Sequence, residues 1–152
     1  MNSKNVQHNM PWSYKKHVAV RVLITFASAC ITAFIGTFIH RFGAYYNIPI
    51  GLVLSYLLLG ISTWCARQRD GAVGLAVHLI ASSTLIVLLS GRGIAGDVLV
   101  PIGFSVSVPY FVSQVGYWWL YGSLLLQIIV LILPKQWFVL PETRVEELHD
   151  ET

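Results

Sequence analysis

The sequence predicts an all-α membrane protein whose four transmembrane helices form an antiparallel bundle, with both termini on the cytoplasmic side. Three observations support this fold class. Of the 152 residues, 55% are hydrophobic and only 11% are charged, whereas soluble domains carry roughly 25% charged residues. The apolar residues form four long blocks, and about 20 such residues suffice for a helix to cross a bilayer. Basic residues gather at alternate ends of these blocks, which is the pattern that orients membrane proteins.

The first two blocks predict transmembrane helices at about residues 18–39 and 48–66. The segment His40-Arg41-Phe42-Gly43 closes the first block. Pro49 stands at the start of the second block, where proline is tolerated because the first N–H groups of a helix have no partner inside it. A short connection between these blocks makes the two helices antiparallel neighbours.

The other two blocks predict helices at about residues 72–90 and 116–133. The polar run from Arg67 to Gly71 predicts a tight turn, so that the second and third helices form a hairpin. The connection 91–115 is long and rich in Val and Phe, which predicts an interfacial or re-entrant segment instead of a solvated loop. Residues 134–152 are expected to form a cytoplasmic tail that is acidic from Glu142 to Thr152, and the whole chain 1–152 is expected to be one membrane domain.

The distribution of Lys and Arg predicts the orientation. Two basic residues, Arg41 and Arg92, flank the helices on one side of the bundle. The other side holds eight: Lys4, Lys15, Lys16, Arg21, Arg67, Arg69, Lys135 and Arg144. Because positive residues stay inside, both termini are predicted to face the cytoplasm. The net charge of +3 therefore reflects membrane orientation and not a nucleic-acid partner.

A lipoprotein signal is an alternative interpretation of the N-terminal region. Basic residues, an apolar run and then Ala27-Ser28-Ala29-Cys30 resemble a signal that ends at a modified cysteine. However, residues 31–39 remain apolar, whereas a lipoprotein continues with a polar tether. The first block is therefore expected to stay as a transmembrane helix.

Each block carries small and weakly polar residues at helical spacing. In a bilayer such residues mark the faces where helices approach closely. The stripes are Ala29, Ala33, Gly36, Thr37 and His40; Gly51, Ser55 and Ser62; Gly74, His78 and Ser82; and Gly116, Ser123 and Gln127. They predict a packed bundle, although a polar pathway through the membrane would use the same residues.

His78 and Gln127 are the most polar residues within the third and fourth blocks. An ionisable residue inside the membrane is a functional-site hypothesis by default, and the plainer interpretation is a histidine that is hydrogen-bonded to a neighbouring serine or glutamine. The blocks contain no Asp or Glu at depth, which argues against a proton-coupled multidrug transporter. The five histidines show no metal-ligand spacing. We therefore expect no metal, no cofactor and no catalytic residue, and the protein is not expected to be an enzyme.

Arg92 and Asp97 are the most distinctive charged residues outside the blocks. They lie five residues apart among three glycines, which permit tight backbone turns. The two side chains are expected either to pair and pin the loop or to recognise a lipid headgroup or a partner.

The segment 92–120 resembles small four-helix membrane proteins of actinobacteria whose function is uncharacterised. The resemblance rests on Arg92 followed by Gly96-Asp97-Val98-Leu99-Val100-Pro101, and on Gly116-Tyr117-Trp118-Trp119-Leu120 at the start of the last block. It implies a bacterial inner membrane and a four-helix layout, and it implies no catalytic residue.

Two functions follow as hypotheses. The first is an accessory or scaffold protein that packs against another membrane protein or against itself within the lipid bilayer. The alternative is a homo-oligomeric channel or transporter in which several copies line a pore with His78, Ser82, Ser123 and Gln127.

Overall fold

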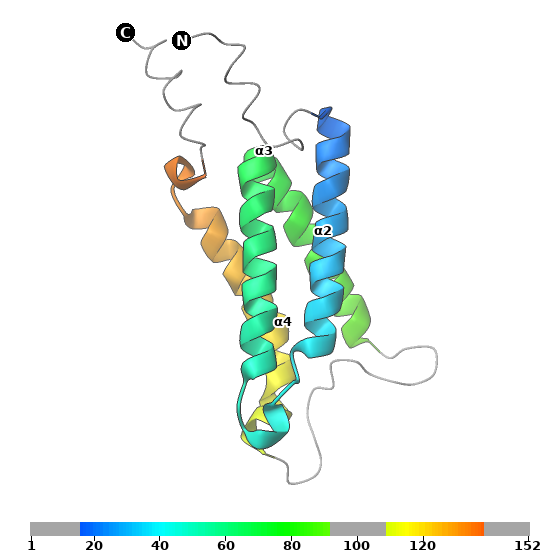
Figure 1. Cartoon of the computed structure of the whole chain (residues 1–152), viewed down its shortest axis with the longest axis vertical. Coiled ribbons are helices and arrows are strands. Elements are labelled where there is room, and N and C mark those ends of the chain that lie inside the picture. Colours follow the sequence, from blue (N-terminus) through cyan, green and yellow to red (C-terminus); the bar gives the residue numbers. More distant parts are fainter. Residues whose placement is uncertain (1–15, 92–108, 139–152) are drawn as a thin grey trace.

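The computed structural model describes residues 16–91 and 109–138, and these residues are helical without any strand. The elements are α2 (Val18–Ile39), the short 3-10 helix η1 (Ala44–Tyr46), α3 (Ile50–Ser90), α4 (Tyr110–Ile132) and the 3-10 helix η2 (Lys135–Trp137). Figure 1 shows them packed side by side as an elongated bundle. The prediction of an all-helical chain is thus confirmed for the described residues.

Helix α2 occupies the range predicted for the first block, 18–39. It begins after His17, whose Nδ1 accepts a hydrogen bond from the Ala19 amide at 3.4 Å. Beyond its end, Gly43 adopts a left-handed conformation with φ 82°. A side chain is excluded at this position because a Cβ would lie 2.7 Å from the carbonyl oxygen of Ile48. This turn directs the chain from α2 back along the bundle into α3.

Helix α3 spans residues 50–90, but its backbone leaves the helical conformation in the middle. Asp70 and Gly71 have non-helical backbone angles, and Gly71 has φ 59°, which glycine adopts without steric cost. The segments on either side, which we name arm 1 (50–69) and arm 2 (72–90), run in opposite directions (Figure 1). Ser62 and His78 would be about 24 Å apart along a straight helix, yet their side chains are hydrogen-bonded at 2.9 Å. The polar run from Arg67 to Gly71 therefore reverses the chain.

Two helix boundaries differ from the prediction. Arm 1 begins at Ile50 instead of residue 48, because Pro49 is its N-cap residue and not part of the helix. Helix α4 begins at Tyr110, after Pro109, instead of residue 116. The last residues of the predicted connection 91–115 are thus the first turns of α4. Residues 92–108 of that connection lie outside the described residues.

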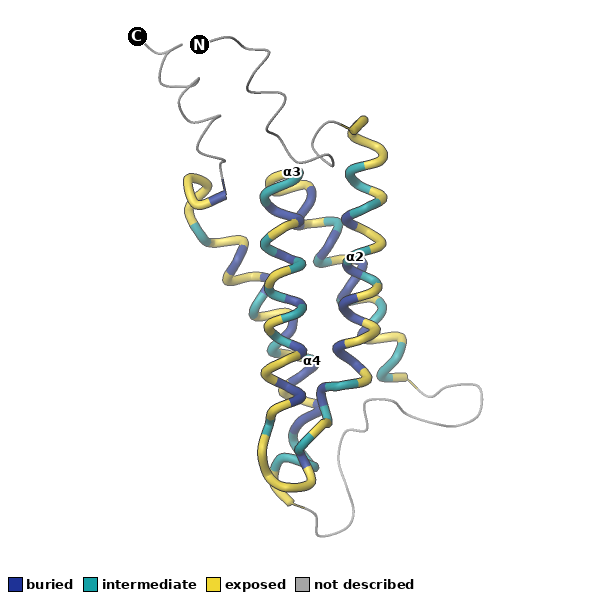
Figure 2. The backbone as a smooth tube through the Cα atoms, viewed as in Figure 1, coloured by how far each residue is buried: buried dark blue, intermediate teal, exposed yellow. Residues whose placement is uncertain are grey.

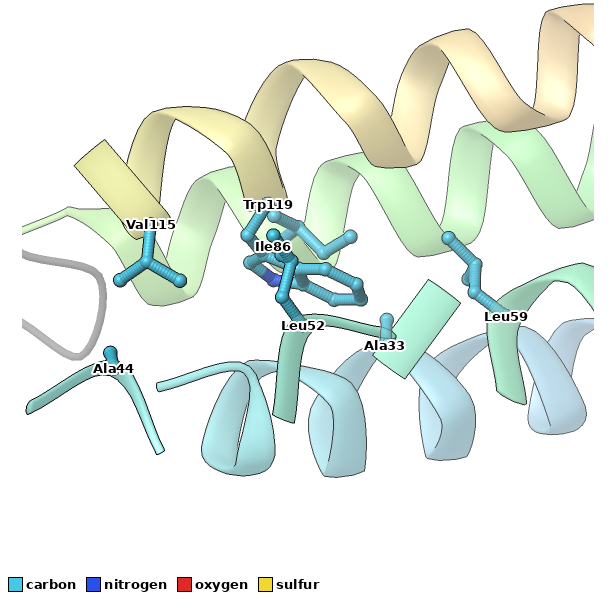
Figure 3. Close-up of a cluster of buried hydrophobic side chains, with 7 residues drawn as sticks. All are labelled: Ala33, Ala44, Leu52, Leu59, Ile86, Val115 and Trp119. Atoms are coloured by element: carbon cyan, nitrogen blue, oxygen red, sulfur yellow. The ribbon is translucent and has the colours of Figure 1, made fainter. Parts of the chain in front are cut away.

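The main core lies where α2, both arms of α3 and α4 meet (Figure 3). Its largest member is Trp119, which is fully buried and lies against α2. The ring approaches so closely that a Cβ on Gly36 would lie 2.6 Å from it. The other buried members are Ala33, Ala44, Leu52, Leu59, Ile86 and Val115.

The outer surface of the bundle is apolar. Figure 2 shows buried positions alternating with exposed ones along every helix, and the exposed positions include Phe26, Ile61 and Leu88. Contiguous apolar surface of this kind marks a protein or membrane contact. Within the described residues, three helices are long and apolar enough to cross a membrane, namely α2, α3 and α4.

Candidate functional site

A cluster of polar side chains lies between the two arms of α3 and helix α4. Its centre is His78 of arm 2, which is fully buried. Ser62 of arm 1 contacts the ring nitrogen Nε2 at 2.9 Å, and Gln127 of α4 contacts Nδ1 through Oε1 at 3.0 Å. Thr63 Oγ1 lies 3.4 Å from Nδ1. The ring therefore ties three helical segments together.

Ser82 and Ser123 complete the cluster around Gln127. The Ser82 hydroxyl lies one helical turn beyond His78, 2.7 Å from its carbonyl oxygen and 3.2 Å from Gln127 Oε1. The Gln127 amide nitrogen donates to the Ser123 carbonyl oxygen at 3.3 Å. Both polar atoms of the glutamine side chain are thus hydrogen-bonded, although the side chain is fully buried. A buried amide without such partners would be costly.

A neutral His78 ring satisfies all of these contacts. With hydrogen on Nδ1, the ring donates to Gln127 Oε1, and Nε2 accepts the hydrogen of the Ser62 hydroxyl. This tautomer is assigned from the partners of the two nitrogens. The cluster is therefore closed: its groups bond to each other and to helix carbonyls.

The predicted stripes of small and polar residues face the inside of the bundle. On α2 the members Ala29, Ala33, Gly36 and Thr37 are buried. The members on α3 and α4 are buried as well, except Ser62, which is half-buried: Gly51, Ser55, Gly74, His78, Ser82, Gly116, Ser123 and Gln127. The stripes therefore lie inside the bundle, where the helices approach one another.

A second polar cluster surrounds the turn of α3. Arg21 of α2 forms a salt bridge of 2.7 Å with Asp70 and also donates to the Arg69 carbonyl oxygen. Arg69 in turn donates to Thr25 Oγ1 at 2.8 Å. The Asp70 side chain is only 8% exposed. The sequence indicated these arginines as an orientation signal, and it gave no indication that Arg21 and Asp70 meet.

Arg67 joins the same end of the bundle to α4. Its guanidinium donates to the carbonyl oxygens of Val130 and, at 2.8 Å, of Leu133. It also lies 4.4 Å from the centre of the Phe138 ring, where cation–π attraction applies. Arg67 therefore bonds to carbonyl groups at the end of α4 that have no partner within that helix.

His40 lies just beyond the other end of α2. Its Nδ1 contacts the Thr37 carbonyl oxygen at 2.6 Å, and its ring stacks on Trp119 with centroids 5.9 Å apart. Burial lowers the pKa of His40 to about 4. The ring is therefore neutral at neutral pH and serves as a packing residue.

The structure brings two of the four predicted site residues together, since His78 and Gln127 are hydrogen-bonded. Arg92 and Asp97 lie outside the described residues, so their pairing stays a prediction. In the two described stretches, no three His, Cys, Asp or Glu side chains gather to form a metal site. Cys30 and Cys65 are free thiols.

An apolar groove opens between arm 1 and α4. Its volume is about 330 Å³ and it is lined by Tyr56, Leu57, Gly60, Ile61, Trp64, Cys65 and Leu126. None of these residues belongs to the cluster around His78. The groove and the polar cluster therefore share no residue, and the groove is a separate, apolar feature of the bundle.

No protein-family model, curated protein or solved structure matches the chain.

Proposed function

We propose that this chain is a four-span protein of a bacterial inner membrane that acts as a non-enzymatic accessory or scaffold subunit, packing against another membrane protein. The observation that carries the proposal is the closed cluster around His78 and Gln127. The side chains that would have to line a pathway are bonded to one another inside a single chain.

The length of α3 supports four spans. Its 41 residues would extend about 62 Å as a straight helix, which is twice the roughly 30 Å of a bilayer core. The reversal at Asp70 and Gly71 divides it into two arms that are each of spanning length. With α2 and α4, the bundle then crosses the membrane four times and places both ends of the chain on one side.

The described charges support an orientation with this side in the cytoplasm. Lys16 precedes α2, Arg67 and Arg69 precede the turn of α3, and Lys135 follows α4. These positions lie at one end of the bundle (Figure 1). Arg41, after α2, is the basic residue that the structure describes at the opposite end. The asymmetry agrees with the rule that positive residues remain inside.

The burial of the polar side chains favours a subunit over a pore. A pore requires side chains that face water, whereas His78, Ser82 and Gln127 are fully buried and Ser123 is 2% exposed. In membranes, hydrogen bonds between helices each contribute about 0.6 kcal/mol and at most about 1.7. The cluster is therefore suited to fixing how the helices pack, which is what a scaffold needs.

The test combines transport and association. The purified protein is reconstituted into liposomes, and fluxes of protons, potassium and chloride are compared with those of empty vesicles. We expect no selective flux from the wild type, His78→Leu or Gln127→Leu. In parallel, mild solubilisation of native membranes should yield a membrane protein in fixed stoichiometry, identified by mass spectrometry and confirmed by reciprocal purification.

Thr84→Leu serves as the matched control, because Thr84 is an exposed residue on arm 2 outside the cluster. A selective flux that His78→Leu or Gln127→Leu abolishes, and Thr84→Leu preserves at equal protein levels, would overturn the subunit in favour of the pore. The absence of any stoichiometric partner would also contradict the proposal.

A further inference from the structure

The outer face of α4 carries exposed aromatic side chains. We define the α4 face as Tyr117, Trp118, Tyr121 and Leu125. The other three members lie three or four residues from Tyr121, so all four share one side of the helix. Their exposed fractions are 38%, 53%, 65% and 58%. The rings of Tyr117 and Tyr121 stack in parallel with centroids 6.4 Å apart. The α4 face is thus an ordered aromatic surface on the outside of the bundle.

Tyr121 lies at the midpoint of α4. The helix runs from Tyr110 to Ile132, so eleven residues, or about 16 Å, separate Tyr121 from either end. If α4 crosses the bilayer, this tyrosine lies at the depth of the hydrocarbon core. Tyrosine normally prefers the membrane–water interface, where its hydroxyl is hydrated.

The Tyr121 hydroxyl has no hydrogen-bond partner in the part of the chain that the structure describes. Tyr56 provides the contrast, because its hydroxyl donates to the Trp118 carbonyl oxygen inside the bundle. Lipid tails offer neither donors nor acceptors, and an unpaired hydroxyl in such surroundings is costly. The partner that Tyr121 requires therefore lies outside the residues that the structure describes.

We propose that a second copy of this chain covers the α4 face, and that the two Tyr121 hydroxyls bond to each other across a two-fold axis along the membrane normal. A phenol is both donor and acceptor, so the pair is self-complementary. Two copies inserted in the same orientation place Tyr121 at the same depth automatically. Helix α4 contains no charged residue, so no like charges meet. Two-fold dimers are also the commonest symmetric assemblies.

The dimer goes beyond the proposed function, since it requires insertion in a membrane but no other protein. Its test therefore uses the purified chain alone. Failure of the dimer would leave the association with another membrane protein untouched, and failure to find that protein would not affect the dimer.

Self-association is measured by energy transfer between donor- and acceptor-labelled copies at increasing dilution in lipid vesicles. We expect the wild type to dimerise and Tyr121→Phe to weaken the dimer by about three- to eighteenfold, the range that interhelical hydrogen bonds give. Tyr56→Phe is the matched control. It removes a hydroxyl that is bonded within the chain, so it should lower thermal stability and leave the dimer constant unchanged.

Cross-linking locates the interface. In a chain with Cys30→Ala and Cys65→Ala, Leu125→Cys lies on the α4 face, leaves Tyr121 intact and should form an intermolecular disulfide rapidly under mild oxidation. Leu88→Cys should not, because Leu88 lies on arm 2 and is exposed elsewhere on the bundle. A wild-type chain that stays monomeric at every lipid dilution overturns the proposal. So does a dimer that is insensitive to Tyr121→Phe, or one that cross-links equally well at residue 88.

Discussion

At the scale of single residues, the bundle depends on a few positions where a ring fills the space left by a missing side chain. Trp119 is the largest fully buried residue, and it fits because Gly36 has no Cβ. The Trp119 indole also donates to Thr37 Oγ1 at 3.2 Å, which fixes the ring's orientation. The sequence marked Gly36 as part of a helix-contact stripe, but it could not specify which side chain would occupy the gap.

Gly36→Ala should therefore lower the free energy of unfolding in detergent by about 1–3 kcal/mol, the usual cost of overpacking a core. The added methyl would lie 2.6 Å from a rigid, fully buried ring. Gly60→Ala is the matched control, because the nearest atom to its Cβ is Leu126 Cδ2 at 3.5 Å, an ordinary contact. That variant should be neutral or stabilised by up to about 1 kcal/mol, since alanine favours helix. Equal losses in both variants, measured by thermal unfolding, would show that the close Trp119 contact is unimportant.

The candidate site was predictable in part for a physical reason. His78 and Gln127 stand out because polar side chains are rare in apolar helices, and each needs a partner. Their mutual contact depends on the relative depth of arm 2 and α4, which no local pattern encodes. The Arg21–Asp70 pair was missed for the same reason: its members are 49 residues apart, and tertiary packing alone brings them together.

At the scale of elements, α2 and the reversal in α3 were predictable because strong local signals define them. The polar run that ends in Gly71 supplies both charge and a left-handed backbone position. The start of α4 was misplaced because residues 110–115 mix aromatic, Val and polar residues and continue the Val- and Phe-rich composition of the segment before them. Pro109 was the available signal, since proline often stands at the beginning of a helix.

Arg67 is expected to be the principal tie between α3 and the end of α4. Arg67→Leu would remove the donors to the Val130 and Leu133 carbonyl oxygens and should lower the free energy of unfolding by about 1–3 kcal/mol, the cost of leaving buried polar groups unsatisfied. Arg67→Lys should restore only part of this loss, because a single ammonium lacks the planar fork of the guanidinium. Lys135→Leu is the control, since Lys135 is exposed at the same end. Thermal unfolding in which Arg67→Leu and Lys135→Leu behave alike would contradict this role.

At the scale of the whole molecule, the bundle separates two kinds of surface. Polar side chains cluster inside or at the end that carries Arg67 and Arg69, while the flanks expose apolar groups over α2, α3 and α4. Composition was sufficient to predict this division, because a chain with 11% charged residues lacks the polar groups to cover itself in water. Composition could not predict which flank meets another protein, since every flank is similarly apolar. On the α4 flank, the Tyr121 hydroxyl lies at the middle of the helix and has no partner among the described residues.

The proposed orientation makes a prediction about the entire chain. In the background Cys30→Ala, Cys65→Ala, single cysteines introduced at Asn2 and Thr152 should resist a membrane-impermeant thiol reagent in intact cells and react after the cells are opened. Cysteines introduced at Gly93 and at Tyr45, which is 77% exposed in η1, should react from outside. The physical reason is the excess of basic residues at the end that holds both termini, which the membrane retains in the cytoplasm. Labelling of both termini from outside would invert the orientation. Labelling of only one terminus would require an odd number of spans and would contradict the four-span proposal.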